Sequence, residues 1–343
     1  MRKWYLLLIS LVAAAVLFAA LSLSYEDTDS RVLKLKDPVQ VVLKSVEGQP
    51  MDFWDIVIRG IDEASREFGI PYEISGPRYE REINKQIKIL ESVIEKHPPL
   101  IILAASDYKK LVYLVEKAGD MGIPVITMDS GIDSGIPVSF IATDNVAAGR
   151  KAGGEMNRLL QNKDRNSVAI VSHIKETATA IDREAGVREA LKEESIAGTW
   201  FCDVDPVKAY RITLELLKNK SIGGIVALNE VSTLGVARAI EEKGMQDKVA
   251  VVGFDNAIKE LSYLEAGVIK ATVVQKPYNM GYMTVKTAYE YLKGMVVPDF
   301  IDTGSILITK DNMFKREYQE ILFPFGGKNG NQEARQEKFK QTP

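Results

Sequence analysis

The stretch K-V-A-V-V-G-F-D-N, residues 248–256, decides how the rest of this chain is interpreted. A short apolar run rich in valine stops at Gly253, and an aromatic, an acid and an amide follow it. Such a run between helical patterns is typical of a buried parallel strand. Ligands of open α/β sheets bind beyond the carboxyl ends of the strands, so Asp255 is a candidate ligand contact. The alternative is that Asp255 only caps the turn that follows.

Helical and extended patterns alternate around this stretch along most of the chain. Extended runs are predicted at 39–45, 72–75, 100–105, 124–128, 140–142, 167–172, 198–202, 224–228, 249–252, 300–303 and 305–309. Helices are predicted at 53–68, 80–96, 108–121, 146–161, 178–193, 206–218, 232–243 and 280–293. This alternation predicts right-handed crossovers and parallel sheets. One compact sheet needs fewer units, so we expect two similar Rossmann-like α/β lobes.

Composition removes several classes of function. The chain has 343 residues, of which 46% are hydrophobic, and a formal net charge of −3, so a large core is expected and a nucleic-acid partner is not. Cys202 is the only cysteine, which excludes a disulfide within the chain. His97 and His173 stand far apart, without metal-ligand spacing. Neither a metal nor another cofactor is expected.

The N-terminus carries a targeting signal. Arg2 and Lys3 precede residues 4–23, which hold no charge and are long enough to span a membrane. The positive charges predict that this end stays in the cytoplasm and that the folded part lies outside. We expect a transmembrane anchor or uncleaved signal at 1–24 and a linker at 25–36, hence a single-pass protein of the cell membrane whose binding domain is extracellular or periplasmic. A cleaved signal peptide is the alternative.

Motifs for enzyme chemistry are missing from the sequence. No G-x-G-x-x-G follows a predicted strand, and no G-x-x-x-x-G-K-[ST] occurs. G-I-D-S-G at 131–135 has its serine one place too late for a nucleophile elbow. Without a plausible histidine base, we expect a protein that is not an enzyme, and an enzyme acting on a small polar metabolite is the alternative.

Polar side chains stand at or just past the ends of many extended runs. They are Lys44, Ser45, Ser106, Asp107, Asp129, Ser130, Asn229, Glu230, Asp255, Asn256 and Gln275. If the carboxyl ends of two sheets face each other across a cleft, these groups converge on it. Amides and carboxylates suit a neutral polyhydroxylated ligand, whose hydroxyls both donate and accept hydrogen bonds.

Phe53 and Trp54 open the first predicted helix, where an aromatic pair can cover the apolar face of a sugar ring. The alternative is that both belong to the core, just as Lys44 can be a solvated charge at a strand end. Asp144 and Asn145 precede a helix in T-D-N-V and fit a cap and turn better than ligand contacts.

Taken together, these motifs resemble a known family over residues 38–322. The matching stretches are D-F-W-D-I-V-I-R-G-I at 52–61, I-P-V-I-T-M-D-S at 123–130, I-A-T-D-N-V-A-A-G at 141–149, R-E-A-G-V at 183–187, A-L-N-E at 227–230, V-V-G-F-D-N at 251–256 and A-T-V-V-Q-K-P at 271–277. Their order and spacing are similar to the periplasmic sugar-binding proteins of the ribose-binding type, or periplasmic binding protein type I, whose core LacI-type repressors share. The hydrophobic N-terminus resembles the membrane-anchored, xylose-sensing binding proteins of clostridia.

The resemblance implies ligand contacts at a defined set of positions. They are Phe53, Trp54, Asp129, Asn229, Asp255 and Gln275. It also implies a three-segment hinge, with crossings near 143–144, 275–276 and 304. The implied lobes are 37–143 plus 276–304 and 144–275 plus 305–323, followed by a disordered tail at 324–343.

Two departures from the ribose binders bear on the ligand. Those proteins usually carry an arginine directly after the first acid, where this chain has Ser130, and another two residues before Arg183, where it has Ile181. The loss of two bidentate donors favours another pentose, a hexose or a related polyol. Arg183 is a candidate replacement, although that position is more often a structural helix residue in the family.

The resemblance implies a protein that closes its two lobes around a monosaccharide. Two partners compete: the permease of an ABC importer, or a membrane sensor histidine kinase of a two-component system. The predicted N-terminal span favours chemosensing through the kinase. A transcription repressor is not expected, because a hydrophobic span stands where that branch of the family has its helix-turn-helix.

Overall fold

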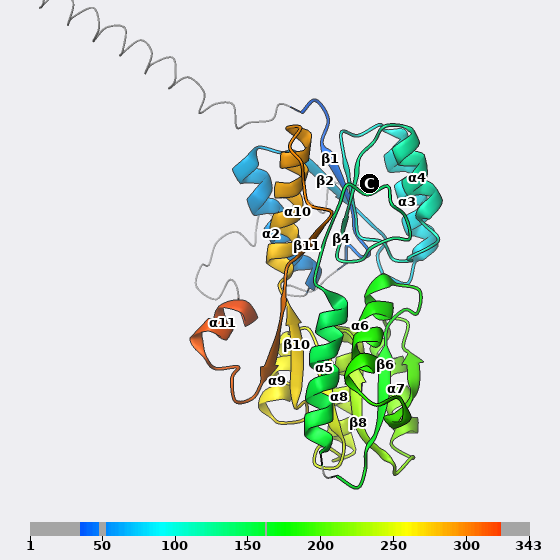
Figure 1. Ribbon diagram of the computed structural model, residues 1–343, viewed down its shortest axis with the longest axis vertical. Coiled ribbons are helices and arrows are strands. Elements are labelled where there is room, and N and C mark those ends of the chain that lie inside the picture. The colour runs from blue at the N-terminus through cyan, green and yellow to red at the C-terminus, as the bar shows by residue number, and fades with distance from the viewer. Residues whose placement is uncertain (1–34, 48–52, 162, 324–343) are drawn as a thin grey trace, which may run out of the picture.

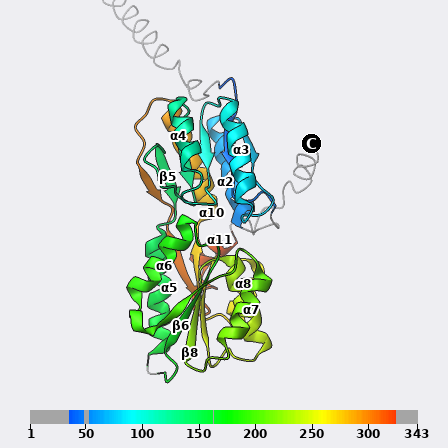
Figure 2. The same ribbon diagram turned by 90° about the vertical axis from the view of Figure 1, so that its right-hand side faces the viewer.

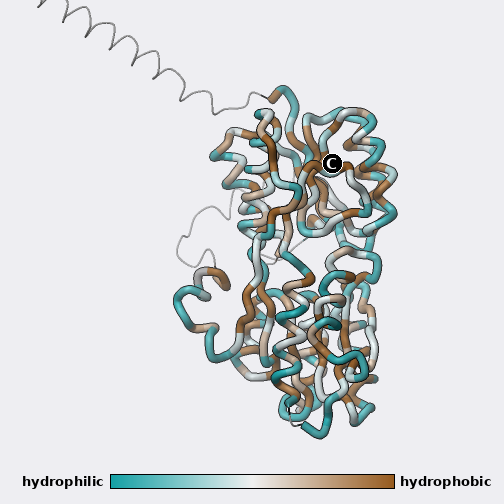
Figure 3. Tube along the Cα trace, in the orientation of Figure 1, coloured by the Kyte–Doolittle hydropathy of each residue, from teal (hydrophilic) through white to brown (hydrophobic). Residues whose placement is uncertain are grey.

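The computed structural model describes residues 35–47, 53–161 and 163–323, which form two α/β lobes stacked along the long axis of the molecule (Figure 1). Apolar stretches run through the inside of each lobe, and hydrophilic stretches cover much of the outer surface (Figure 3). The predicted two-lobe α/β fold is confirmed.

The sheet of the N-terminal lobe has the strand order β11-β5-β4-β3-β1-β2, and all its strands run parallel. The strands are β1 (Val39–Val42), β2 (Tyr72–Ser75), β3 (Ile101–Leu103), β4 (Val125–Met128), β5 (Ser139–Ala142) and β11 (Phe300–Asp302). Side chains alternate between the two faces. On β3, Ile102 packs into one core cluster, whereas Ile101 and Leu103 pack into another.

Helices cover both faces of this sheet, as buried parallel strands require. They are α2 (Phe53–Phe68), α3 (Ile83–Glu95), α4 (Val112–Asp120) and α10 (Pro277–Leu292). Helices α2 and α10 lie on one face and α3 and α4 on the other (Figures 1 and 2). Helix α10 comes late in the chain, so this lobe is completed by a distant segment.

The sheet of the C-terminal lobe has the order β12-β10-β9-β8-β6-β7. The strands are β6 (Ser167–Ser172), β7 (Ile196–Phe201), β8 (Ile222–Ala227), β9 (Ala250–Phe254), β10 (Ala271–Gln275) and β12 (Ser305–Thr309). The helices are α5 (Asn145–Leu160), α6 (Ala178–Ala190), α7 (Pro206–Leu216), α8 (Glu230–Glu242), α9 (Ile258–Glu265) and α11 (Arg316–Leu322), with a 3₁₀ turn at Glu193–Ser195. Helices α5 and α6 cover one face, and α7, α8, α9 and α11 pack on the other.

Some expectations about the elements are wrong. Strand β12 runs antiparallel to β10, because only the two-residue connection Thr303–Gly304 separates it from β11 and it enters the second sheet from the opposite end. Helix α3 begins at Ile83, three residues later than predicted. Helices α9 and α11 are additional elements that the sequence pattern did not predict.

In the described residues the chain passes between the sheets three times: from β5 to α5, from β10 to α10, and from β11 to β12. The side chain of Asp302 forms hydrogen bonds at two of these crossings. Asp302 Oδ1 accepts hydrogen bonds from the N–H groups of Asp144, at 2.9 Å, and Gly304, at 2.8 Å. Gly304 has φ of +80°, a conformation that suits glycine.

The predicted N-terminal span, the linker up to residue 34 and the tail at 324–343 lie outside the described residues. Among the helices that the structure describes, none is both long and apolar enough to cross a membrane.

Candidate functional site

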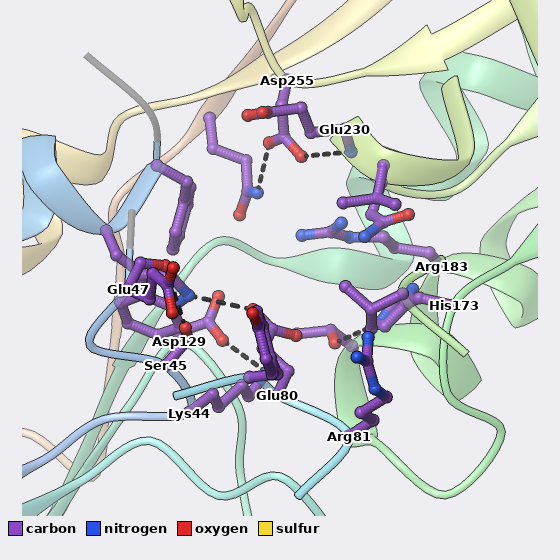
Figure 4. Close-up of a pocket in the computed structure, with 18 residues that line it drawn as sticks. Lys44, Ser45, Glu47, Glu80, Arg81, Asp129, His173, Arg183, Glu230 and Asp255 are labelled. Carbon is purple, nitrogen blue, oxygen red and sulfur yellow. Dashed lines mark hydrogen bonds and ion pairs between the residues drawn. The ribbon is translucent and has the colours of Figure 1, made fainter. Parts of the chain in front are cut away.

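A cavity of about 250 Å³ lies between the lobes, at the carboxyl ends of the strands of both sheets (Figure 4). The N-terminal lobe contributes Lys44, Ser45, Glu47, Phe53, Trp54, Tyr79, Glu80, Arg81 and Asp129. The C-terminal lobe contributes His173, Thr179, Arg183, Val204, Asn229, Glu230, Val231, Asp255 and Gln275. Of the nine predicted site residues, this cavity brings together all but Ser130.

Asp129 and Asp255 occupy equivalent places in the two sheets. Each directly follows the third strand in its sheet order, β4 or β9, and each has a left-handed backbone, with φ of +63° and +77°. Each N–H donates to a carbonyl of the neighbouring strand, Ile141 or Val273, at 3.0 Å. Such backbone is uncommon for residues other than glycine, although aspartate tolerates it, and it brings both carboxyl groups to the cavity.

Lys44 is a buried partner of Asp129, not a solvated charge. Its Nζ lies 2.6 Å from Asp129 Oδ2, and both side chains are largely excluded from solvent. Figure 4 shows the pair on the wall formed by the N-terminal lobe. The pair stabilises a carboxylate that would otherwise be costly to bury.

Among the residues that the structure describes, Asp255 has no basic partner at ion-pair distance, and neutral groups donate hydrogen bonds to it. Gln275 Nε2 donates to its Oδ1 at 2.8 Å, and the Glu230 N–H donates to its Oδ2 at 3.0 Å. Burial raises the pKa of Asp255, while Arg183 and these hydrogen bonds act in the opposite direction. The next helix, α9, has Ala257 at its N-cap without a side-chain cap. Asp255 is therefore not the cap of the following turn.

Phe53 and Trp54 lie at the start of α2 and both line the cavity. Their rings meet edge to face, with centroids 5.1 Å apart. Both also pack against the core of the lobe, and Trp54 Nε1 donates to Glu80 Oε1 at 2.9 Å. The core and ligand interpretations are therefore compatible for this pair.

Arg183 and Asn229 reach the cavity but have structural bonds as well. Arg183 Nε donates to Asn145 Oδ1 at 2.8 Å, and its Nη1 donates to the Leu228 carbonyl at 2.7 Å. Asn229 caps α8, since its Oδ1 accepts from the Ser232 N–H at 3.0 Å. The expectation that Arg183 replaces a missing ligand-binding guanidinium is weakened, because both bonds hold its guanidinium within the lobe.

Ser130 is a prediction that the geometry does not support. Its side chain is fully buried and is not among the residues that line the cavity. The left-handed conformation at Asp129 turns the chain, and the Ser130 N–H returns to the Met128 carbonyl at 2.7 Å. Asp144 is an N-cap as expected, with Oδ1 accepting from the Ala147 N–H at 2.9 Å.

The two walls of the cleft also touch each other outside the cavity. The Tyr108 N–H, which follows β3 in the N-terminal lobe, donates to the Glu176 carbonyl, which precedes α6 in the C-terminal lobe, at 2.8 Å. The lobes thus share a backbone hydrogen bond outside the residues that line the cavity.

The periplasmic binding protein domain family matches residues 43–295, which is more than half of the chain. This chain belongs to that family. The D-allose-binding periplasmic protein of Escherichia coli strain K12 is 29% identical over 287 residues, covering 79% of this chain and 91% of that protein. A solved carbohydrate transporter solute-binding protein of Agrobacterium radiobacter, in complex with D-arabinose, has a TM-score of 0.78 at 30% identity and covers 84% of this chain and 100% of its own. A sugar transporter structure from Clostridium phytofermentans has a TM-score of 0.74 at 35% identity, with 80% and 100% covered.

Several lining residues of this periplasmic binding protein escaped the sequence analysis. His173 was considered only as a base or metal ligand, but its Nε2 lies 3.0 Å from the hydroxyls of Thr177 and Thr179. Burial, with Arg183 and Lys44 nearby, holds its pKa well below the ordinary value, so it is neutral. Glu80 was assigned to a helix that in fact begins after it. The signal that could have found His173 is its place directly after the strand Ser167–Ser172.

Proposed function

We propose that this periplasmic binding protein binds a monosaccharide, that is a pentose, a hexose or a related polyol, between its lobes. The observation that carries the proposal is the placement of Asp129 and Asp255 on opposite walls of one cavity of about 250 Å³. Ionised carboxylates accept hydrogen bonds from hydroxyls. Phe53 and Trp54 supply the apolar surface that suits the C–H face of a sugar ring. The cavity lies below the range of about 300–1,000 Å³ that is usual for drug-sized ligands, which fits a single sugar ring.

The chemistry of the wall favours a sugar other than ribose. Ser130 and Ile181 stand where ribose binders usually have arginines, and Arg183 is engaged by Asn145 and the Leu228 carbonyl. The names of the relatives mention D-ribose as well as D-allose, D-arabinose and tagatose, which supports the same general class without selecting a member.

Closure of the lobes is part of the proposal. The lobes 37–143 plus 276–304 and 144–275 plus 305–323 would turn about the three crossings, where few residues connect the sheets. A ligand that contacts both walls favours the closed state, because only that state makes both sets of contacts.

The closed protein would deliver its sugar to the permease of an ABC importer. Support comes from the names of relatives, such as a ribose import binding protein of Haemophilus influenzae that is 30% identical over 213 residues. A sensor histidine kinase is the second candidate partner, favoured by the apolar stretch at 4–23. Neighbouring genes distinguish the two: permease and ATPase genes favour import, and a histidine kinase gene favours sensing.

Calorimetric titration of the purified protein tests the sugar. D-allose, D-ribose, D-arabinose, D-tagatose, D-fucose and a polyol form the panel, with thermal melting as a second measurement. We expect heat and a raised melting temperature with at least one of them. The absence of both signals with every member contradicts sugar binding. The enzymatic alternative predicts turnover of a bound sugar, which NMR would detect.

A further inference from the structure

Glu80 lies in the turn between β2 and α3 and reaches into the cavity near Asp129 and Arg81 (Figure 4). We propose that Glu80 is a ligand-contacting residue that selects sugars presenting a free hydroxyl to the N-terminal wall of the cleft. This inference rests on the proposed function, because it concerns the same cavity.

The backbone around Glu80 is fixed before any ligand arrives. Ser45 Oγ donates to the Arg78 carbonyl at 2.7 Å, which ties the turn to the loop after β1. Glu82 Oε2 accepts from the Tyr79 N–H at 3.1 Å and closes the turn itself. A side chain on such a turn has a defined position, so its contact with a ligand costs little ordering.

One of the two carboxylate oxygens of Glu80 is already used. Trp54 Nε1 donates to Oε1 at 2.9 Å, and this bond also fixes the indole beside Phe53. Within the described residues, it is the only hydrogen bond of this carboxylate. Because an ionised carboxylate offers about four acceptor sites, Oε2 has the capacity to accept from a ligand hydroxyl.

The electrostatic surroundings make added donors favourable. Burial raises the pKa of Glu80, Lys44 and the Trp54 bond lower it, and Asp129 and Asp255 raise it again. Lys44, the nearby cation, already binds Asp129 at 2.6 Å. A hydroxyl that donates to Glu80 therefore stabilises a carboxylate that its neighbours compensate only in part.

The cavity that Glu80 faces offers buried acceptors to hydroxyl donors of a ligand. On the opposite wall, Gln275 adds a second acceptor, since its Oε1 is buried and has no partner among the described residues. Ser130 and Ile181 stand where ribose binders usually have arginines, although Arg81 and Arg183 also line the cavity. A deoxy or O-methyl sugar leaves a buried acceptor such as Glu80 without its partner, so we expect such a sugar to bind more weakly.

Glu80→Gln tests the proposal with little change of shape. Glutamine keeps a carbonyl oxygen for Trp54 and replaces the other oxygen by a donor. Glu116→Gln, at an exposed acid on α4, is the matched control for loss of charge. The full-length proteins are titrated with the sugar panel, and then with the monodeoxy and mono-O-methyl derivatives of the tightest-binding sugar.

We expect wild type and Glu116→Gln to bind that sugar equally and to bind one derivative at least about tenfold more weakly. Glu80→Gln should bind the parent sugar at least about tenfold more weakly than wild type does. It should no longer prefer the parent sugar to that derivative. The melting temperature of the free variant should equal that of wild type. Trp54→Phe, which keeps the carboxylate, should weaken binding but retain the preference.

Two outcomes contradict the inference in different ways. If wild type binds the parent sugar and Glu80→Gln shows the same affinity and the same preference, Glu80 is not a ligand contact although the proposed function stands. If wild type binds no member of the panel, sugar binding itself fails and the role of Glu80 fails with it.

Discussion

Asp129 and Asp255 share a backbone conformation, but different groups stabilise their carboxylate charges. Asp129 has a buried ammonium beside it, whereas Asp255 depends on an amide and a backbone N–H. A ligand hydroxyl thus meets a carboxylate paired with an ammonium on one wall and, on the other, a carboxylate whose hydrogen-bond donors are neutral and whose nearby cation among the described residues, Arg183, forms no ion pair with it. The affinity for sugar should therefore depend strongly on the Asp255 carboxylate.

Asp255→Asn should weaken sugar binding by about tenfold or more, because hydrogen bonds to a charged acceptor are the stronger kind. Asparagine tolerates the left-handed backbone at this position, so the circular dichroism spectrum and the melting temperature should change little. Calorimetry measures the affinity. A variant that binds as tightly as wild type would show that the carboxylate is not used.

Glu260, beneath Asp255, gives a prediction about pH. It is fully buried, and its Oε1 accepts from Thr272 Oγ1 at 2.7 Å. Burial raises its pKa well above the ordinary value, Asp255 and Glu230 raise it further, and the Thr272 bond acts in the opposite direction. Because the pKa of Glu260 is raised in the folded state, its contribution to the stability of the protein is complete below the unfolded pKa of about 4.3. That contribution is lost as the pH rises toward and through the folded-state pKa.

Glu260→Gln removes that loss and keeps an oxygen for Thr272. The difference in melting temperature, variant minus wild type, should therefore be larger at pH 8 than at pH 5. Thermal melts at both values, with Glu116→Gln as control, measure the difference. An equal difference at pH 5 and pH 8 would mean that Glu260 titrates alike in the folded and unfolded chain.

Two helix pairs, one in each lobe, pack so closely that glycines lie at their contacts. In the C-terminal lobe, a Cβ on Gly149 of α5 would lie 2.2 Å from the Arg183 carbonyl oxygen, and one on Gly186 of α6 would lie 2.0 Å from that of Val146. In the N-terminal lobe, Gly281 of α10 and Gly60 of α2 make the same kind of contact. In each lobe, one helix of the pair is the one that follows a crossing.

Gly149→Ala should destabilise the protein by a few kcal/mol, because two helices must move apart to admit the methyl group. Gly154→Ala, in the same helix and facing open space, is the control and should be neutral or stabilising by up to about 1 kcal/mol. Urea unfolding measures both. Equal stabilities of the two variants would contradict the close packing.

Local patterns predicted most elements, since strands such as Ser167–Ser172 have an apolar centre, V-A-I-V, and most helices carry an apolar face. They failed where tertiary context decides. Glu80 precedes a helix without a side-chain N-cap, so no local signal marked the start at Ile83. The antiparallel direction of β12 follows from a crossing, not from its composition. Ser130 was misplaced because the sequence does not show the left-handed turn at Asp129.

The backbone hydrogen bond between Tyr108 and Glu176 joins the two lobes and therefore depends on their relative position. If the lobes open without sugar, this bond breaks and the Tyr108 amide hydrogen exchanges with solvent. Hydrogen exchange should therefore be slower at Tyr108 with saturating sugar than without it. The Val226 amide, inside β8, serves as the control and should be unaffected. Equal exchange at Tyr108 in both conditions would exclude an opening at this point.

The three crossings also affect the order in which the protein can be made. The N-terminal sheet ends with β11, at Phe300–Asp302, and the C-terminal sheet with β12, at Ser305–Thr309. Synthesis runs from the N-terminus, yet neither lobe has its last strand until more than 300 residues exist. A chain stopped after α9 would hold two incomplete sheets instead of one finished domain. We therefore expect the two lobes to complete their folds nearly together at the end of translation, unlike the usual course for multidomain chains, in which one domain folds before the next.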